Sequence, residues 1–101
     1  MSGVNNPYRY FYETVAASQT AQVLGTNGAV GDYLHRIIAV VTTAATSTVS
    51  ILDDTTSISL LPATTVAGTY SLELNLRSKE GPWKVTTGAG VSVIAVGIFS
   101  A

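Results

Sequence analysis

Residues 70–77 have the sequence Tyr70-Ser71-Leu72-Glu73-Leu74-Asn75-Leu76-Arg77, in which large apolar side chains alternate with polar ones at every step. A period of two places the two kinds of side chain on opposite faces of a β-strand. This is the clearest strand pattern in the chain. It predicts that the face formed by Tyr70, Leu72, Leu74 and Leu76 lies in a hydrophobic core.

Strand patterns continue on both sides of this segment. In residues 8–16, tyrosines at every second position predict a strand, although Phe11 makes its second face partly aromatic. Residues 49–60 carry alternating apolar side chains around the short polar run 53–56, whose side chains can bond their own backbone in a turn. We therefore expect a β-hairpin there.

Two longer segments, residues 33–41 from Ile37 onward and residues 91–99, are apolar on both faces. Such runs are typical of central strands that are covered on both faces. Gly97 inside the second run predicts a β-bulge or a close approach of another backbone. Residues 14–24 contain alanine and glutamine, which favour a helical turn, but their β-branched residues make an extended conformation the better prediction.

The patterns add up to about eight short strands in 101 residues. Their spacing is typical of an antiparallel β-sandwich, and we expect a jelly-roll-like arrangement, with a closed barrel as the alternative. Val91, Val93 and Ala95 are expected in the core together with the apolar face of residues 70–77. The prediction is one all-β domain over residues 8–101, preceded by a flexible arm at residues 1–7.

Composition limits the partners of this domain. Charged residues make up 11% of the chain and the net charge is −1, so the basic surface that binds nucleic acid is not expected. The absence of cysteine excludes disulfides, thiolate zinc sites and a cysteine nucleophile. Residues 1–6 do not have the pattern of a secretory signal, and no apolar run has the length of a membrane helix. We expect neither nucleic acid nor a membrane as a partner.

Catalytic and metal-binding patterns fit poorly. His35 is the only histidine, and in a strand it faces the side opposite to Asp32, so the two would not form an acid–base pair. Asp53 and Asp54 lack the further oxygen ligands of a calcium loop and are better explained as a solvated turn. Glycines 25, 28 and 31 are not followed by the residues of a phosphate-binding loop. The sequence predicts no enzyme, no cofactor and no metal.

The aromatic residues are the best candidates for binding a partner. Tyrosine and tryptophan are enriched at interfaces, and core packing is the alternative, more so for Trp83 than for the tyrosines. The predicted contact residues are Tyr8, Arg9, Tyr10 and Tyr12 in the N-terminal segment, and Lys79 and Trp83 in the loop 79–83. Sheet edges are usually protected by lysine or proline, and this chain has few of either, so we expect a homo-oligomer.

Three stretches of small and β-branched residues carry a resemblance to a known group of proteins. They are Val15-Ala16-Ala17-Ser18-Gln19-Thr20, Gly28-Ala29-Val30-Gly31-Asp32-Tyr33-Leu34, and residues 81–97, from Gly81-Pro82-Trp83-Lys84 to Ala95-Val96-Gly97. Over residues 14–99 the chain resembles small virion proteins of tailed bacteriophages.

This resemblance implies a capsid decoration or cement protein that works without catalysis. It implies a location on the outer capsid surface, the major capsid protein as the partner, and self-association, with a trimer preferred. It carries over no individual site residues. A carbohydrate-binding module on the phage head or tail is the alternative function, and a small hydrolase is a weaker one.

Overall fold

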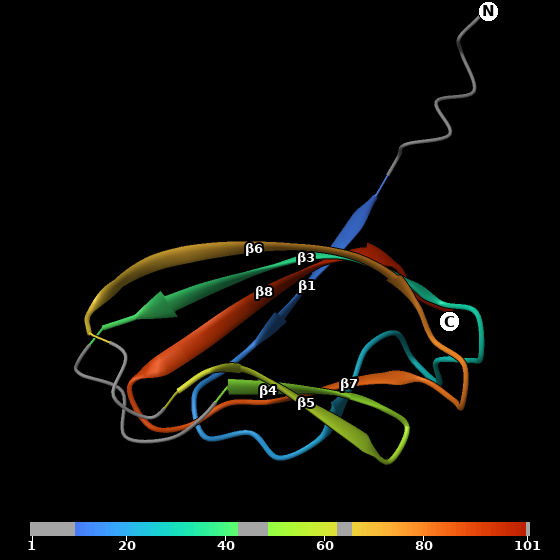
Figure 1. Cartoon of the computed structure of the whole chain (residues 1–101), viewed down its shortest axis with the longest axis horizontal. Helices are drawn as coiled ribbons and strands as arrows, with labels where there is room; N and C mark the ends of the chain where they lie inside the picture. The colour runs from blue at the N-terminus through green and yellow to red at the C-terminus, as the bar shows by residue number, and fades with distance from the viewer. Residues whose placement is uncertain (1–9, 43–48, 63–65, 101) are drawn as a thin grey trace, which may run out of the picture.

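The computed structural model describes residues 10–42, 49–62 and 66–100, and within these ranges the chain forms strands, turns and loops with no helix. The strands are β1 (Phe11–Val15), β2 (Gln22–Val23), β3 (Tyr33–Val41), β4 (Val49–Asp53), β5 (Thr56–Leu61), β6 (Gly68–Arg77), β7 (Trp83–Thr86) and β8 (Val91–Ile98). Figure 1 shows them in two layers.

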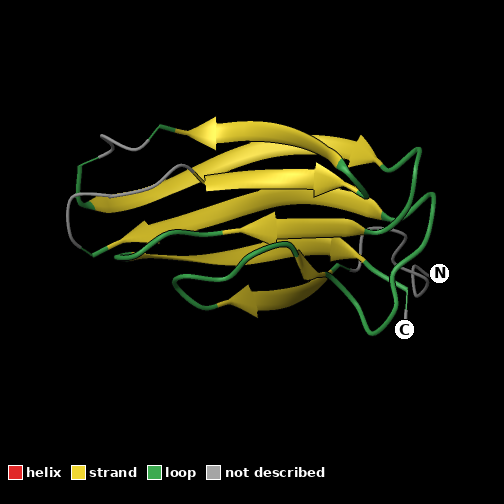
Figure 2. Cartoon of the chain, turned by 90° about the horizontal axis from the view of Figure 1, so that it is seen from below, coloured by secondary structure: helices red, strands yellow, loops and turns green. Residues whose placement is uncertain are grey.

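Each layer is a four-stranded antiparallel sheet. Sheet A has the order β1-β8-β3-β6 and sheet B has the order β2-β7-β4-β5. The strands of both sheets run along a common direction in Figure 2, as in an aligned sandwich. The chain crosses repeatedly between the sheets, which makes the order jelly-roll-like. The predicted all-β sandwich is confirmed, and the barrel alternative is not what forms.

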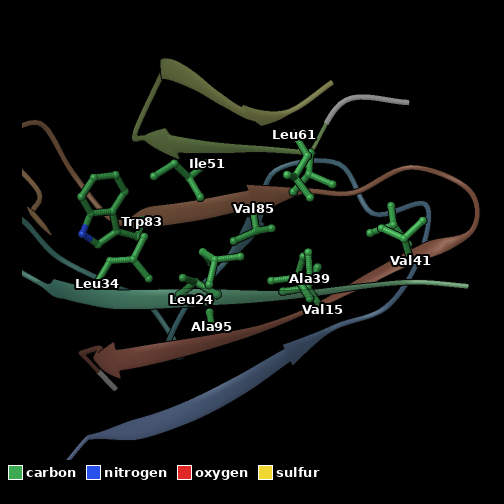
Figure 3. Close-up of a cluster of buried hydrophobic side chains, with 14 residues drawn as sticks. Val15, Leu24, Leu34, Ala39, Val41, Ile51, Leu61, Trp83, Val85 and Ala95 are labelled. Carbon is green, nitrogen blue, oxygen red and sulfur yellow. The ribbon is translucent and has the colours of Figure 1, made fainter. Parts of the chain in front are cut away.

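The core lies between the two sheets. Alternate side chains of β3, β4, β7 and β8 point into it, and Figure 3 shows them as one cluster. Val91, Val93 and Ala95 are each at most 1% exposed, as predicted. Trp83 is 2% exposed and its indole N–H donates a hydrogen bond of 2.9 Å to the backbone carbonyl of Asp32, so its one polar atom is satisfied inside the core.

The prediction for residues 70–77 is correct as a strand but wrong for part of its core face. Tyr70, Leu72 and Leu74 pack against the core while remaining partly exposed, and Leu76 is 37% exposed. The physical reason is the position of β6 at the edge of sheet A. β6 is the last strand of sheet A, so its inward side chains have a neighbour on one side only.

Three local predictions can be compared directly with the structure. The hairpin forms between β4 and β5, with Asp54 at a φ of 57° in its turn. Residues 16–24 form turns and the short strand β2, and no helix. The strand predicted over residues 8–16 is described as β1 from Phe11 onward, and Tyr8 and Arg9 lie outside the described residues.

A bulge shapes one end of sheet A. The register between β3 and β8 shifts between Leu34 and Arg36, so His35 and Arg36 both face outward. Gly97 lies opposite this bulge, and a Cβ atom there would collide with the backbone carbonyl of Tyr33. The close backbone approach predicted at Gly97 is confirmed.

Candidate interaction surface

The face of sheet A that points away from sheet B is defined here as the outer face. The register pairs Tyr12 of β1 with Val96 of β8, and Ile38 of β3 with Ile94 of β8. The alternation of buried and less buried residues in β3 and β8 shows which side chains point outward. The apolar side chains on the outer face are Tyr12, Ile38, Val40, Ile94, Val96 and Ile98.

No further layer covers the outer face among the described residues. The expectation that residues 33–41 are covered on both faces therefore differs from the structure, in which no layer of the described residues covers the outer face. Alternate residues of β3, such as Ile37 and Ala39, are fully buried, whereas Ile38 and Val40 lie on the uncovered side. The sequence pattern of a doubly covered strand is present, but the part of the chain that the structure describes covers only one face of it.

The outer side of sheet B is different in chemistry. Its central strands place Ser50 and Leu52 of β4 beside Thr86 and Lys84 of β7. Apart from Leu52, these side chains carry hydroxyls and a charge, which suit contact with water, as expected for the solvated side of an antiparallel sheet. The contrast makes the apolar outer face of sheet A a specific feature of this molecule.

Aromatic rings gather at the bulged end of the outer face. The Tyr10 ring stacks on His35 with the ring centres 4.5 Å apart, and it lies 5.9 Å from the Tyr33 ring. Asn75, whose backbone has a φ of 53°, accepts a 2.6 Å hydrogen bond from the Tyr33 hydroxyl, and its Oδ1 lies 2.9 Å from His35 Nδ1. The Arg77 guanidinium lies over the Tyr33 ring at 5.5 Å. These five residues form what we call the aromatic cluster.

The predicted contact residues of the N-terminal segment divide into two groups. Tyr10 belongs to the aromatic cluster, and Tyr12 is 73% exposed on the same face of the sheet. Phe11 points to the other face but is also 65% exposed. Tyr8 and Arg9 lie outside the described residues, so their role stays a prediction.

The loop that carries Lys79 and Trp83 has a structural role in this fold. The Trp83 side chain is buried, which is the core-packing alternative, and we do not include it in the surface. Lys79 is exposed, and its backbone N–H donates a 2.8 Å hydrogen bond to the carboxylate of Asp53. The structure therefore does not bring Trp83 together with the exposed tyrosines.

Asp53 holds this loop with its carboxylate. The backbone N–H groups of Lys79, Glu80 and Gly81 donate to it over 2.8, 3.1 and 3.3 Å. Burial would raise the pKa of Asp53, but these three donors and the nearby Lys79 charge outweigh that effect, so its pKa lies below the ordinary value. The predicted solvated turn is wrong for Asp53, which is 6% exposed.

A second buried carboxylate, Asp32, organises the same end of the sandwich. It accepts hydrogen bonds from the backbone of Ala29 and from both the backbone and the hydroxyl of Ser100. His35 faces outward, so the two residues lie on opposite sides as predicted. The described ranges contain no group of three or more His, Cys, Asp or Glu residues placed to hold a metal ion. They also contain no helix long and apolar enough to span a membrane.

The sequence and the structure of the chain were compared with those of known proteins. No protein family, curated protein or solved structure matches it. A jelly-roll-like sandwich is used by viral capsid proteins and by lectins alike, so the fold does not select a function. The feature of this chain that bears on function is therefore the outer face of sheet A.

The sequence analysis did not identify the aliphatic part of this surface. The sequence patterns predict buried strand faces for its four aliphatic residues, which are Ile38, Val40, Ile94 and Val96. The signal that could have found them is a count of layers, because about eight strands make only two sheets, and a two-layer sandwich covers each sheet on one face.

Proposed function

We propose that this chain is a non-enzymatic structural protein of a bacteriophage virion. It acts as a capsid decoration or cement protein, which binds the major capsid protein on the outer surface of the head and bridges neighbouring capsid subunits. One observation carries the proposal, namely the apolar outer face of sheet A, which the described residues leave without a covering layer. The resemblance to small phage virion proteins supplies the kind of partner.

The composition of the outer face supports a protein partner. Its centre is aliphatic and its β6 side carries Arg36, Glu73 and Arg77. A protein interface typically has an apolar centre with few charges and a polar rim, and it is enriched in tyrosine and arginine. The two arginines and one glutamate leave no strong net charge for nucleic acid to recognise.

The size of the outer face supports contact with more than one surface. Four strands about 4.8 Å apart, with an average length of about eight residues, give a face of roughly 500 Å². A stable interface takes about 800 Å² from each partner. We therefore propose that the N-terminal segment with Tyr8, Arg9, Tyr10 and Tyr12 adds to the contact, and that copies of the protein associate with one another, with a trimer preferred.

The proposal is tested by the number of copies in the virion. Quantitative mass spectrometry of purified particles of the phage that encodes this chain should give hundreds of copies per head. Particles that lack the protein should lose their genome at a lower temperature than complete particles. A count of tens or fewer, or no protein in the particle, would overturn the decoration role.

A carbohydrate-binding module of the virion is the second candidate. The aromatic cluster favours it, because partly exposed rings beside the polar groups of Asn75 and Arg77 are the chemistry that sugar rings require. A glycan array separates the two functions. Binding to a defined glycan that Tyr10→Ala in the aromatic cluster weakens, together with a low copy number, would favour the carbohydrate module over the decoration protein.

A further inference from the structure

The edge of sheet A formed by β6 is long and regular. β6 spans ten residues, the longest strand in the structure, and β3 is its one neighbour among the described residues. Its residues from Gly68 to Glu73 pair with β3 without interruption. Regular geometry ends after Leu74, because Asn75 has a left-handed backbone with a φ of 53°. Residues 68–74 thus offer a row of backbone N–H and C=O groups along a strand that Figure 1 shows as curved.

This edge lacks the usual protection against pairing with another strand. Lysine, proline, bulges and inward-pointing charges are the common devices. Residues 68–74 contain no lysine or proline, and their one charge, Glu73, lies on the outer face opposite Arg36. The first irregularity, at Asn75, comes only after seven residues of strand. An unprotected edge of this length is expected to pair.

The inward side chains of β6 give the same edge an apolar surface. Tyr70, Leu72 and Leu74 pack against the core and remain partly exposed, and Leu76 is 37% exposed. A further strand beside β6 would cover these side chains from the open side. Backbone and side chains therefore favour the same event, which is the addition of a strand to sheet A.

We propose that the added strand is β6 of a second copy, paired antiparallel around a two-fold axis at Ser71. The antiparallel edge is complementary to itself, so a two-fold axis satisfies both copies equally. An axis at Ser71 overlaps all seven regular residues. It places Tyr70 opposite Leu72 of the second copy on the inner side, and Thr69 opposite Glu73 of the second copy on the outer side. Apolar side chains then meet one another, and the two glutamates are kept apart.

A register centred on Glu73 is poorer. An axis at Glu73 would place the two carboxylates directly opposite each other, which destabilises a strand pair. It would also bring the irregular Asn75 backbone into the pairing. The product of the Ser71 register is a continuous eight-stranded sheet with its outer faces side by side. The inference rests on the proposed self-association, for which the β6 edge favours a two-fold dimer in place of the trimer named above, but not on the proposed binding to the capsid.

A cysteine substitution tests the register. The chain has no cysteine, so Ser71→Cys introduces a single thiol that the two-fold axis places within disulfide distance of its counterpart. Ser59→Cys is the matched control, because Ser59 is an exposed serine on β5, the edge strand of sheet B. Under mild oxidation, S71C should form a covalent dimer at least about 10-fold faster than S59C. Equal rates would overturn the pairing.

A charge substitution tests the edge without relying on oxidation. Ser71→Glu places two carboxylates opposite each other at the axis, while Ser59→Glu adds the same charge to the other edge. Sedimentation equilibrium should give about twice the monomer mass of 10.5 kDa for the natural chain and for S59E, and the monomer mass for S71E. A three-fold mass that S71E leaves unchanged would overturn the edge pairing and retain self-association. A monomer mass for the natural chain would overturn both.

Discussion

At the residue scale, Asp53 shows how a turn residue can fix a distant loop. Its carboxylate accepts three backbone N–H groups from residues 79–81, so replacing it leaves buried donors without a strong acceptor. Asp53→Asn should lower the free energy of unfolding at pH 7 by about 1–3 kcal/mol, measured by urea denaturation.

Asp54 provides the matched control. Its carboxylate lies 3.5 Å from Lys84 Nζ in a partly exposed ion pair, and its left-handed backbone also suits asparagine. Asp54→Asn should change the free energy of unfolding by less than about 1 kcal/mol. Equal losses for the two variants would contradict the role given to the carboxylate of Asp53.

The same residue predicts a dependence of stability on pH. Because the pKa of Asp53 is lower in the folded chain than in the unfolded chain, its charged form stabilises the fold at neutral pH. That contribution is complete above the ordinary aspartate pKa of about 3.9 and is lost as the pH falls through the lower folded value. Urea titrations between pH 7 and pH 2 should therefore show a steeper loss for the natural chain than for Asp53→Asn. Parallel curves would contradict this prediction.

Gly97 carries a second prediction at this scale. A methyl group at this position would collide with the backbone carbonyl of Tyr33, which the β3 bulge brings close. Gly97→Ala should destabilise the fold by about 1–3 kcal/mol in a thermal or urea unfolding experiment. An unchanged midpoint would mean that the two strands lie further apart than described.

At the scale of the element, β3 has two apolar faces with different functions. Ile37 is fully buried, whereas its neighbour Ile38 lies on the uncovered outer face. Ile37→Ala should cost about 2–5 kcal/mol of stability, as for other buried residues. Ile38→Ala should cost clearly less and should instead weaken binding to capsid shells that lack the protein. Denaturation measures the loss of stability, and co-sedimentation with such shells measures the loss of binding. A larger loss of stability for Ile38→Ala than for Ile37→Ala would contradict the placement of Ile38 on the outer face.

The strands themselves were largely predictable from the sequence. Period-two alternation identified residues 70–77, and the polar run at 53–56 identified the hairpin turn, because both signals are local. The side chain of Asp53 was not predictable, since its partners lie 26 to 28 residues away and meet it only in the folded sandwich. The partial exposure of Leu76 was also hidden, because alternation shows which face is apolar but not whether the strand is central or at an edge.

At the scale of the whole molecule, the proposed function depends on which surfaces of the sandwich contact other protein chains. Its two sheets cover each other on one side, and sheet A remains apolar on its other side and open along β6. The low number of charged residues in the sequence predicted that another protein chain covers an edge of a sheet. It did not predict which edge or that a whole face is involved, since both depend on the strand order.

The central claim is that the outer face of sheet A binds the major capsid protein. The most direct test is a cryo-electron microscopy map of the parent particle at side-chain resolution. We expect the map to show this sandwich on the outer surface of the shell. Ile38 and Ile94 should be buried against the capsid protein, and Tyr12 should lie within the same contact. A map in which these side chains face solvent, or in which the shell does not carry the protein, would contradict it.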